Sequence, residues 1–269
     1  MGPYFERLLA LNSIDRATYI EPFAGGAGAA LYLLAREKVS AVHLNDVDRS
    51  IYAFWHSVTR RNSALIERIR RARVSVAEWD RQKEVQRHKS DASLLDLGFS
   101  TLFLNRTNRS GILRAGMIGG RAHNGKWKLG ARYDKELVIG RIEAVGKLKK
   151  KISLTNIDAR TTSDLTFGHG KRSFLYLDPP YFTKGRDLYI NHFSDDDHGA
   201  LSQKIKSLNK LPWVVTYDDT PKTRELYSDH RKRKFNIQYT ADQRRIGSEF
   251  MVFSPTLIAA RLISIHVGG

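Results

Sequence analysis

Four short apolar runs end abruptly in an acid or a proline, and this feature limits the possible folds more than any other. The runs are "ATYIEP" (17–22), "AVHLND" (41–46), "SFLYLD" (173–178) and "PWVVTYDD" (212–219). None shows the sustained alternation of a strand with one face in water, and segments with helical spacing separate them. This order predicts an α/β fold with a doubly wound, mostly parallel sheet covered by helices on both faces. "FMVFS" (250–254) and "LISIHV" (262–267) predict further strands.

The first run leads into a glycine turn, "EPFAGGAGAAL" (21–31), and then into a helical segment. Glycines in this place allow a tight turn in which backbone N–H groups approach a ligand at the start of the helix. Asp46 lies 20 residues beyond Gly26, where nucleoside-binding α/β folds place an acid for ribose hydroxyls. No Gly-Lys-Ser/Thr follows, which argues against a P-loop. These residues alone leave a nicotinamide dinucleotide site open.

Positive charge is concentrated in one segment. The chain has 45 Lys and Arg against 28 Asp and Glu, and residues 60–151 hold 23 of the former but only 9 of the latter. A local excess of this kind predicts a surface for a polyanion, most often a nucleic acid, although a solvated basic surface is the plainer alternative. We therefore predict a small, mostly helical insert at 59–140 and a core formed by 1–58 and 141–269.

Composition excludes several kinds of site. The 269 residues include no cysteine, and the nine histidines show no metal-ligand spacing, so no metal is predicted. No stretch approaches the roughly 18 consecutive apolar residues of a membrane span, and the start of the chain lacks the pattern of a signal peptide. A cytoplasmic protein that does not bind membranes is expected.

The third run continues into "DPPY" (178–181), which can extend neither a strand nor a helix. Asp178 is expected at the carboxyl end of a central strand, where α/β sheets place their ligands. The prolines make a stiff turn without N–H donors, so a carboxylate and a backbone carbonyl become neighbouring acceptors. That pair matches the two donors of an amino group, and Tyr181 adds a flat face on which a base could stack. The turn suits a planar aromatic amine whose nitrogen attacks a methyl group carried by a sulfonium.

Four motifs occur together: "EPFAGGAG", "LNDVD", "FLNRTNRSGIL" and "FLYLDPPYF". In combination they strongly resemble the Dam-like class of DNA adenine methyltransferases, from about Tyr19 to Phe250. The resemblance implies transfer of a methyl group from S-adenosylmethionine (AdoMet) to the exocyclic amino group of adenine in duplex DNA, with the base flipped out of the helix. It also implies the motif order cofactor, target recognition, catalysis, which puts DNA recognition in the basic insert.

The resemblance assigns residues to the cofactor and to the target base. Those implied to bind AdoMet are Phe23, Gly25, Gly26, Gly28, Asp46 and Asp158. Those implied to hold the adenine are Asp178, Pro179, Pro180 and Tyr181. A hairpin formed by "YTADQRRIGSEF" (239–250) is expected near the base pocket.

In the insert, arginines and lysines are candidates for phosphate contacts, and amide side chains are candidates for reading base edges. The predicted DNA-binding residues are Asn105, Arg106, Asn108, Arg109, Arg114, Arg121, Lys126 and Lys128. Asn124 and Trp127 are further candidates from the same segment.

The chain departs from the family at its start. Members usually carry a "PGGK"-like segment before the first helix, whose lysine helps to hold AdoMet. This chain begins with "MGPY", past that segment, so weaker cofactor binding is expected unless another residue replaces the lysine.

Two alternatives stay open at this point. One is a non-catalytic DNA-binding protein with impaired AdoMet binding, and the other is an RNA adenine methyltransferase. A nicotinamide oxidoreductase would leave the DPPY turn and the basic insert unexplained. A monomer is expected, and the resemblance allows a cognate restriction endonuclease as a partner.

Overall fold

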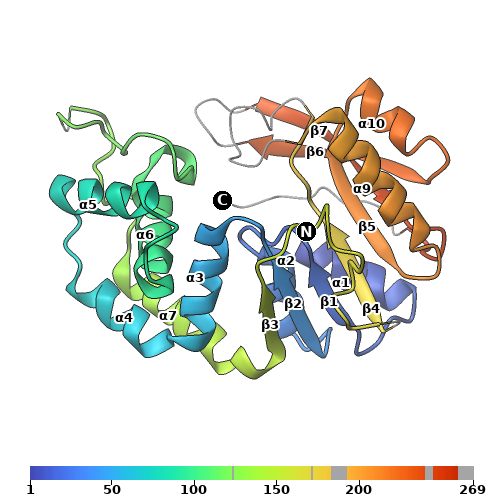
Figure 1. Ribbon diagram of the computed structural model, residues 1–269, viewed down its shortest axis with the longest axis horizontal. Coiled ribbons are helices and arrows are strands. Elements are labelled where there is room, and N and C mark those ends of the chain that lie inside the picture. The colour runs from blue at the N-terminus through green and yellow to red at the C-terminus, as the bar shows by residue number, and fades with distance from the viewer. Residues whose placement is uncertain (123, 171, 183–192, 240–244, 260–269) are drawn as a thin grey trace. The chain divides into compact units, whose positions relative to one another are not determined.

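The structure is a computed structural model that describes residues 1–122, 124–170, 172–182, 193–239 and 245–259 (Figure 1). It divides into two compact units. Unit 1 comprises Met1–Val47 and Lys151–Gly269, and unit 2 comprises Asp48–Lys150. A search of the described residues finds no helix that is both long and apolar enough to cross a membrane. The strand expected at 262–267 lies outside the described residues.

Unit 1 is built on one seven-stranded sheet with the strand order β3-β2-β1-β4-β5-β7-β6. Neighbours from β3 to β5 pair in parallel, whereas β7 pairs antiparallel with both β5 and β6. The prediction of a mostly parallel sheet is confirmed. The strands are β1 (Thr18–Glu21), β2 (Ala41–Asn45), β3 (Ile152–Thr155), β4 (Ser173–Leu177), β5 (Trp213–Asp218), β6 (Lys232–Tyr239) and β7 (Arg245–Phe253).

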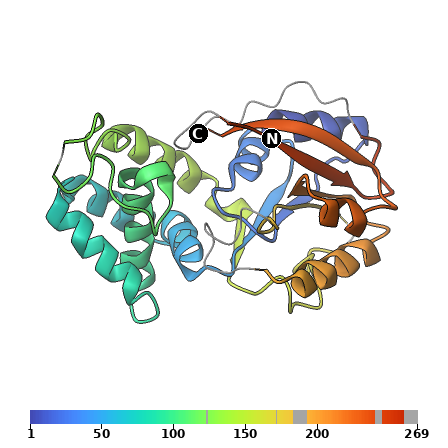
Figure 2. The same ribbon diagram turned by 90° about the horizontal axis from the view of Figure 1, so that it is seen from above.

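The last two strands form the expected hairpin. Tyr239 of β6 pairs with Arg245 of β7, and the pairing runs back to Lys232 and Val252. Figure 2 shows this pair as two long red arrows. The turn at 240–244 lies outside the described residues.

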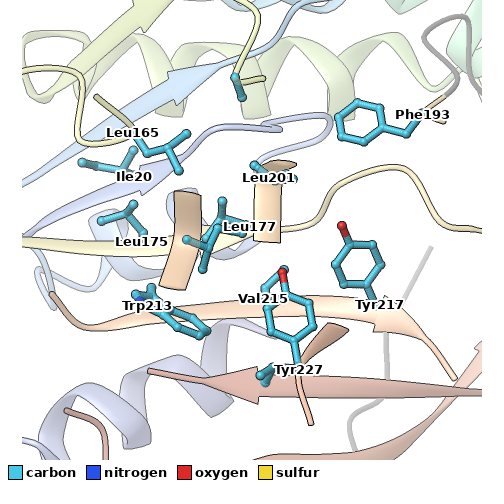
Figure 3. Close-up of a cluster of buried hydrophobic side chains, with 13 residues drawn as sticks. Ile20, Leu165, Leu175, Leu177, Phe193, Leu201, Trp213, Val215, Tyr217 and Tyr227 are labelled. Carbon is cyan, nitrogen blue, oxygen red and sulfur yellow. The ribbon is translucent and has the colours of Figure 1, made fainter. Parts of the chain in front are cut away.

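Helices cover both faces of the sheet in unit 1. Alternate residues of a strand point to opposite faces, and on one face Phe174 and Tyr176 of β4 contact the ring of Phe5, with centroids 5.8 and 4.7 Å apart. On the other face Leu175 and Leu177 join a buried cluster (Figure 3) that includes Ile20, Trp213, Val215, Leu201 and Ile205. Burial on both faces explains why this run is apolar throughout, since each such side chain contributes roughly 1.5–3 kcal/mol. The described helices of this unit are α1 (Gly2–Leu11), α2 (Gly28–Ala35), α9 (Asp195–Ser207) and α10 (Pro221–Leu226).

Unit 2 is helical in its described residues. Its α6 packs against α3 and α5, and α7 packs against α4. Among the described residues between α6 and α7, regular structure is limited to a single short 3-10 turn (Arg109–Gly111) and one isolated bridge, as the irregular sequence there predicts. The helices are α3 (Arg49–Arg60), α4 (Asn62–Arg71), α5 (Val76–Arg87), α6 (Leu94–Thr107) and α7 (Lys135–Lys147).

Unit 2 is longer at both ends than the 59–140 segment that the sequence predicts. Unit 2 begins earlier because α3, which the sequence analysis assigns to the core, packs against α6. Ser57 Oγ of α3 donates a hydrogen bond to the carbonyl of Leu94 at 3.0 Å, and Trp55 is buried. At its end, α7 continues to Lys147.

Asn45, the last residue of β2, joins the loops that follow three neighbouring strands. Its side-chain N–H groups donate to the carbonyls of Pro22 and Ile157, both at 2.9 Å. Its Oδ1 accepts from the Thr155 hydroxyl at 2.7 Å and from the Ile157 N–H at 2.9 Å. All four hydrogen-bonding positions of this buried amide are therefore used. The bonds fix the carboxyl ends of β1, β2 and β3 to one another.

We expect Asn45→Ala to lower the free energy of unfolding by about 2–4 kcal/mol, because truncation leaves several buried donors and acceptors unpaired. Chemical denaturation followed by circular dichroism measures this loss. Asn209→Ala is the matched control, since Asn209 is exposed in the same unit, and it should change stability by less than about 0.5 kcal/mol. Equal losses in the two variants would contradict the role assigned to Asn45.

Candidate active site

The strand order reverses between β1 and β4: β2 follows on the far side of β1, and β5 follows on the far side of β4. Ile20 pairs in parallel with Leu175, so the residues that follow each strand leave the sheet at the same edge. Those residues are the glycine turn after β1 and the DPPY turn after β4. Open α/β sheets bind their ligands at such a reversal, beyond the carboxyl ends of the strands.

The glycine turn leaves open space in front of its backbone. A Cβ built at Gly25, Gly26 or Gly28 would meet no described atom within 4 Å. Gly25 has a φ of +44°, so its backbone favours glycine. Gly26 and Gly28 are exposed. Neither has a positive φ, and no described atom lies where a Cβ would be, so neither the backbone conformation nor packing within the chain requires glycine there. The open space fits a ligand that approaches the N–H groups at the start of α2.

Asp46 lies against this turn. Its Oδ2 accepts a hydrogen bond from the Gly25 N–H at 3.0 Å. The Asn156 side chain in turn donates to the Asp46 carbonyl at 2.6 Å. Phe23, at the start of the turn, contacts the ring of Phe193 at 6.0 Å between centroids. The structure thus brings Phe23, the three glycines and Asp46 together.

Asp158, which follows β3, is bound by Arg160. The guanidinium Nη2 donates to Oδ2 at 2.6 Å, and the Arg160 backbone N–H donates to Oδ1 at 2.9 Å. Hydrogen bonds from the Arg160 side chain lower the pKa of Asp158, so the carboxylate stays charged. The Arg160 Nε also donates to both oxygens of Asp158 at 3.0 Å, so Arg160 alone uses the roughly four hydrogen bonds that a carboxylate accepts. The neighbouring Ile157 exposes an apolar side chain.

Asp178 is oriented from β5. The Thr216 hydroxyl donates to Oδ1 at 2.7 Å, and the Tyr176 hydroxyl lies 3.1 Å from the Thr216 oxygen. Because the Thr216 proton points to the carboxylate, Tyr176 is the donor in the second bond. Within the described part of the chain, Oδ2 of Asp178 accepts no hydrogen bond. One carboxylate oxygen is thus held in place, while the other keeps its capacity to accept.

Asp178 is accessible on one side and shielded from water on the others. Its side chain is exposed, yet desolvation by the surrounding protein raises its pKa, against the opposing effect of the hydrogen bonds from Thr216 and Tyr181. The exposed surface means that a small group can reach the carboxylate. The desolvation means that protein encloses it on its other sides. Pro179 is buried beside it, and Pro180 is half-buried.

The Tyr181 hydroxyl lies between two acids. It donates to Glu249 Oε2 at 2.9 Å and is 3.3 Å from Asp178 Oδ1. Burial, followed by the negative charges of Asp178 and Glu249, raises the pKa of Tyr181, so the phenol keeps its proton. The next residue, Phe182, donates its backbone N–H to Asp218 Oδ1 at 3.2 Å, which ties the turn to β5.

Three buried acids lie at or near this edge of the sheet and do not figure in the sequence-based prediction. They are Glu21 at the end of β1, Asp218 at the end of β5 and its cross-strand partner Glu249 in β7. Glu21 and Asp218 could have been found, because each ends an apolar run as Asp178 does. Glu249 belongs to the hairpin expected near the base pocket, but its position beside Asp218 depends on the pairing of β7 with β5. Asp218 and Glu249, together with Asp178, favour a ligand that carries positive charge.

Glu21 is held in its neutral form. It is 3% exposed, and burial raises its pKa to about 8. The Tyr19 hydroxyl donates to its Oε1 at 3.0 Å, which opposes the shift without reversing it. Glu21 is therefore protonated near neutral pH.

Because the folded-state pKa of Glu21 is raised from 4.5 to about 8, its contribution to stability is complete below about pH 4.5 and is lost as the pH rises toward 8. We expect Glu21→Gln, which cannot ionise, to show a smaller fall in melting temperature than the wild type between about pH 5 and pH 8. Glu225→Gln is the control, since Glu225 is an exposed acid of the same unit. Parallel curves for wild type and Glu21→Gln would exclude the raised pKa.

The predicted DNA-binding residues of unit 2 differ in their surroundings. Arg109, Arg114, Arg121, Lys126 and Lys128 are exposed, and Asn105 and Arg106 are half-buried. Arg121 is bound to Asp80 through two hydrogen bonds of 2.7 and 2.8 Å. Trp127 is 63% exposed, with Lys126 Nζ 5.6 Å from its ring centroid.

Asn108 differs from the other candidates because it is buried. Its Oδ1 accepts from Trp79 Nε1 at 2.6 Å, and its Nδ2 donates to the carbonyls of Ile112 and Leu113 at 2.9 and 3.0 Å. The amide thereby holds the loop that follows α6 against α5. The structure thus places the Asn108 side chain inside this loop. Reading a base edge would require a side chain on the surface of the loop.

The chain is similar to two type II methyltransferases. It is 25% identical to M.MjaIII of Methanocaldococcus jannaschii over 208 residues, which cover 71% of this chain and 70% of that protein. It is 27% identical to M.CviBI of Paramecium bursaria Chlorella virus NC1A over 241 residues, which cover 87% of this chain and 86% of that protein.

Among solved structures, the rRNA methyltransferase aviRa from Streptomyces viridochromogenes aligns with 94% of this chain and 83% of its own, at 12% identity and a TM-score of 0.41. We draw no conclusion about function from a structural similarity this low. Residues 4–246, nearly the whole chain, match the family model of D12 class N6 adenine-specific DNA methyltransferases. With the glycine turn and the DPPY turn meeting at one edge of the sheet, the chain belongs to this family of DNA methyltransferases.

Proposed function

We propose that the edge of the sheet between β1 and β4 is the catalytic centre at which this DNA methyltransferase transfers a methyl group from AdoMet to N6 of adenine. The main support for this proposal is the set of contacts and the exposure of the Asp178 carboxylate. Its Oδ1 is fixed by Thr216, its Oδ2 accepts nothing from the described residues, and its side chain is exposed. The open glycine turn lies on the adjacent strand.

Residues around the glycine turn would hold AdoMet. Open space in front of Gly25, Gly26 and Gly28 fits its methionine part, and Asp46 beside the turn fits the ribose hydroxyls. Near its adenine ring, Asp158 is held by Arg160, and the neighbouring exposed Ile157 offers an apolar surface. When bound, AdoMet supplies a methyl group on a positively charged sulfur, which leaves as a neutral thioether. Asp178, Asp218 and Glu249 at this edge favour that positive charge.

Asp178 and Pro179 would orient the amino group that is methylated. Oδ2 of Asp178 and the Pro179 carbonyl accept the two N6 hydrogens, which frees the nitrogen lone pair from the ring. Held in this way, the lone pair would face the methyl group that AdoMet supplies when bound. One N6 proton must then leave, and Oδ2 can take it, because the raised pKa of Asp178 suits a transient proton acceptor.

The adenine reaches this centre only after it leaves the base stack, which costs a few kcal/mol. Tyr181 would offset part of that cost by stacking on the flipped base. Its hydroxyl is already held by Glu249, so the ring needs little ordering when the base arrives.

The relatives suggest the biological setting. Both M.MjaIII and M.CviBI are named type II methyltransferases. On this basis we propose that the chain methylates a specific DNA site beside a cognate restriction endonuclease, whereas the monomeric state expected from the sequence stays a prediction.

Asp178→Ala tests the assignment. We expect it to lower methyl transfer at least about 10³-fold, because the group that orients N6 is lost, while affinity for duplex DNA stays close to that of the wild type. Transfer of tritium from labelled AdoMet into the adenines of mixed-sequence duplex DNA measures the first quantity, and fluorescence anisotropy measures the second. Asp15→Ala is the control, since Asp15 is an exposed acid of the same unit.

Two outcomes would count against the proposal. Normal turnover by Asp178→Ala would remove Asp178 from the reaction. Absence of label in adenine with folded wild-type protein that binds AdoMet would remove the activity itself.

Thr216→Val tests how Asp178 is held. The Thr216 hydrogen bond favours the charged carboxylate, so its loss should raise the pKa of Asp178 further. We expect the acid limb of the pH–rate profile to move to higher pH and the rate at neutral pH to fall about tenfold. Thr216→Ser keeps the hydroxyl and should restore both. An unshifted profile in Thr216→Val would show that this bond does not tune Asp178.

A further inference from the structure

Unit 2 contains two kinds of arginine. Those of the first kind are paired with carboxylates, so their charge is largely neutralised within the protein. Most of them lie on α4 and α5, and the pairs are Arg68–Asp96, Arg70–Glu143, Arg71–Glu67, Arg81–Glu78, Arg87–Glu84 and Arg121–Asp80.

The second kind has no acidic partner among the described residues, and it comprises Arg49, Arg60, Arg61, Arg73, Arg106, Arg109, Arg114, Arg132 and Arg141. Arg106, Arg132 and Arg141 form no ion pair and no side-chain hydrogen bond with any residue that the structure describes. Arg132 and Arg141 are exposed, whereas Arg106 is half-buried and its Nε is shielded from water without a partner. A half-buried guanidinium that lacks an acceptor is unusual, because its donors are costly to leave unpaired.

Packing brings Arg106 and Arg132 to the same end of α6. Arg106 lies in the last turn of this helix, and Phe103, one turn earlier, contacts the ring of Tyr133 at 5.4 Å. Arg132 directly precedes Tyr133. Its Nη2 lies 3.5 Å from the point that a Cβ would occupy at Gly111, in the turn that follows α6.

Arg141, on α7, completes the cluster. Burial lowers the pKa of Arg106, and the positive charges of Arg132 and Arg141 lower it further, so both charges lie close enough to act on the Arg106 guanidinium. The nearest acids in the sequence do not relieve this repulsion. Asp134 caps the first turn of α7, and the exposed Glu136 forms no ion pair with a described residue.

We propose that Arg106, Arg132 and Arg141 form a binding site for backbone phosphates of the DNA substrate, and that the acid-paired arginines of α4 and α5 do not contact DNA. Guanidinium groups bind phosphate oxygens through paired hydrogen bonds, and a bound phosphate would relieve the repulsion that Arg106 experiences from Arg132 and Arg141. The site rests on the proposed function only in taking duplex DNA as the ligand. It adds Arg132 and Arg141 to the interface and removes Arg121 from it.

The test compares arginines of the two kinds at equal change of net charge. Affinity for a mixed-sequence DNA duplex is measured by anisotropy at several salt concentrations for Arg132→Gln/Arg141→Gln and for Arg71→Gln/Arg87→Gln. All four residues are exposed, and melting curves confirm that the variants fold. Each lost phosphate contact lowers the slope of log K against log salt by about 0.9, so we expect a reduction of up to about 1.8 in the first variant. The second variant should keep the wild-type slope.

The two variants separate a local site from a general effect of charge. Equal slopes in both would overturn the proposal, as would a wild type that does not bind duplex DNA. The measurement needs no AdoMet and no turnover. If methyl transfer fails but the slopes differ, the proposed reaction is wrong and the phosphate site stands. If methyl transfer succeeds but the slopes agree, only the phosphate site is wrong.

Discussion

The parallel pairing of β1 with β4 is the constraint on which the active site depends. It carries the glycine turn and the DPPY turn to one edge of the sheet, although about 150 residues separate them in the chain. The pairing is secured by burial on both faces, where Phe174 meets α1 on one side and Leu175 joins the cluster beneath α9 on the other. A polar substitution within β4 would therefore disturb the chemistry and the core together.

The sequence allowed the fold and the main motifs to be predicted for a physical reason. Apolar runs that end in an acid or a glycine turn are strands whose carboxyl ends meet a ligand, and parallel strands bring those ends together. Thr216 and Glu249 escaped prediction because they come from β5 and β7, and their place beside Asp178 and Tyr181 depends on lateral pairing that no local pattern encodes. Asn108 looked like a surface residue for a related reason: its burial depends on Trp79, on another helix.

The net charge of the basic segment predicted the DNA-binding residues less precisely than the positions of the individual arginines do. The count of lysines and arginines located the basic segment, yet it could not separate arginines that acids neutralise from those left without a counter-charge. That distinction depends on which helices pack together, as Arg70 of α4 and Glu143 of α7 illustrate. The distinction between paired and unpaired arginines narrows the predicted DNA contacts from the whole basic segment to the guanidinium groups near the end of α6.

The four hydrogen bonds of Asn45 have a consequence for cofactor binding. They hold the loops after β1, β2 and β3 together before any ligand arrives, so these loops need not be ordered during binding. Association with a rigid receptor loses little conformational entropy. The nucleoside half of the cofactor would then bind to a preformed site. Calorimetry would show a heat capacity change of binding that the buried ligand surface explains alone, without a further contribution from loop ordering.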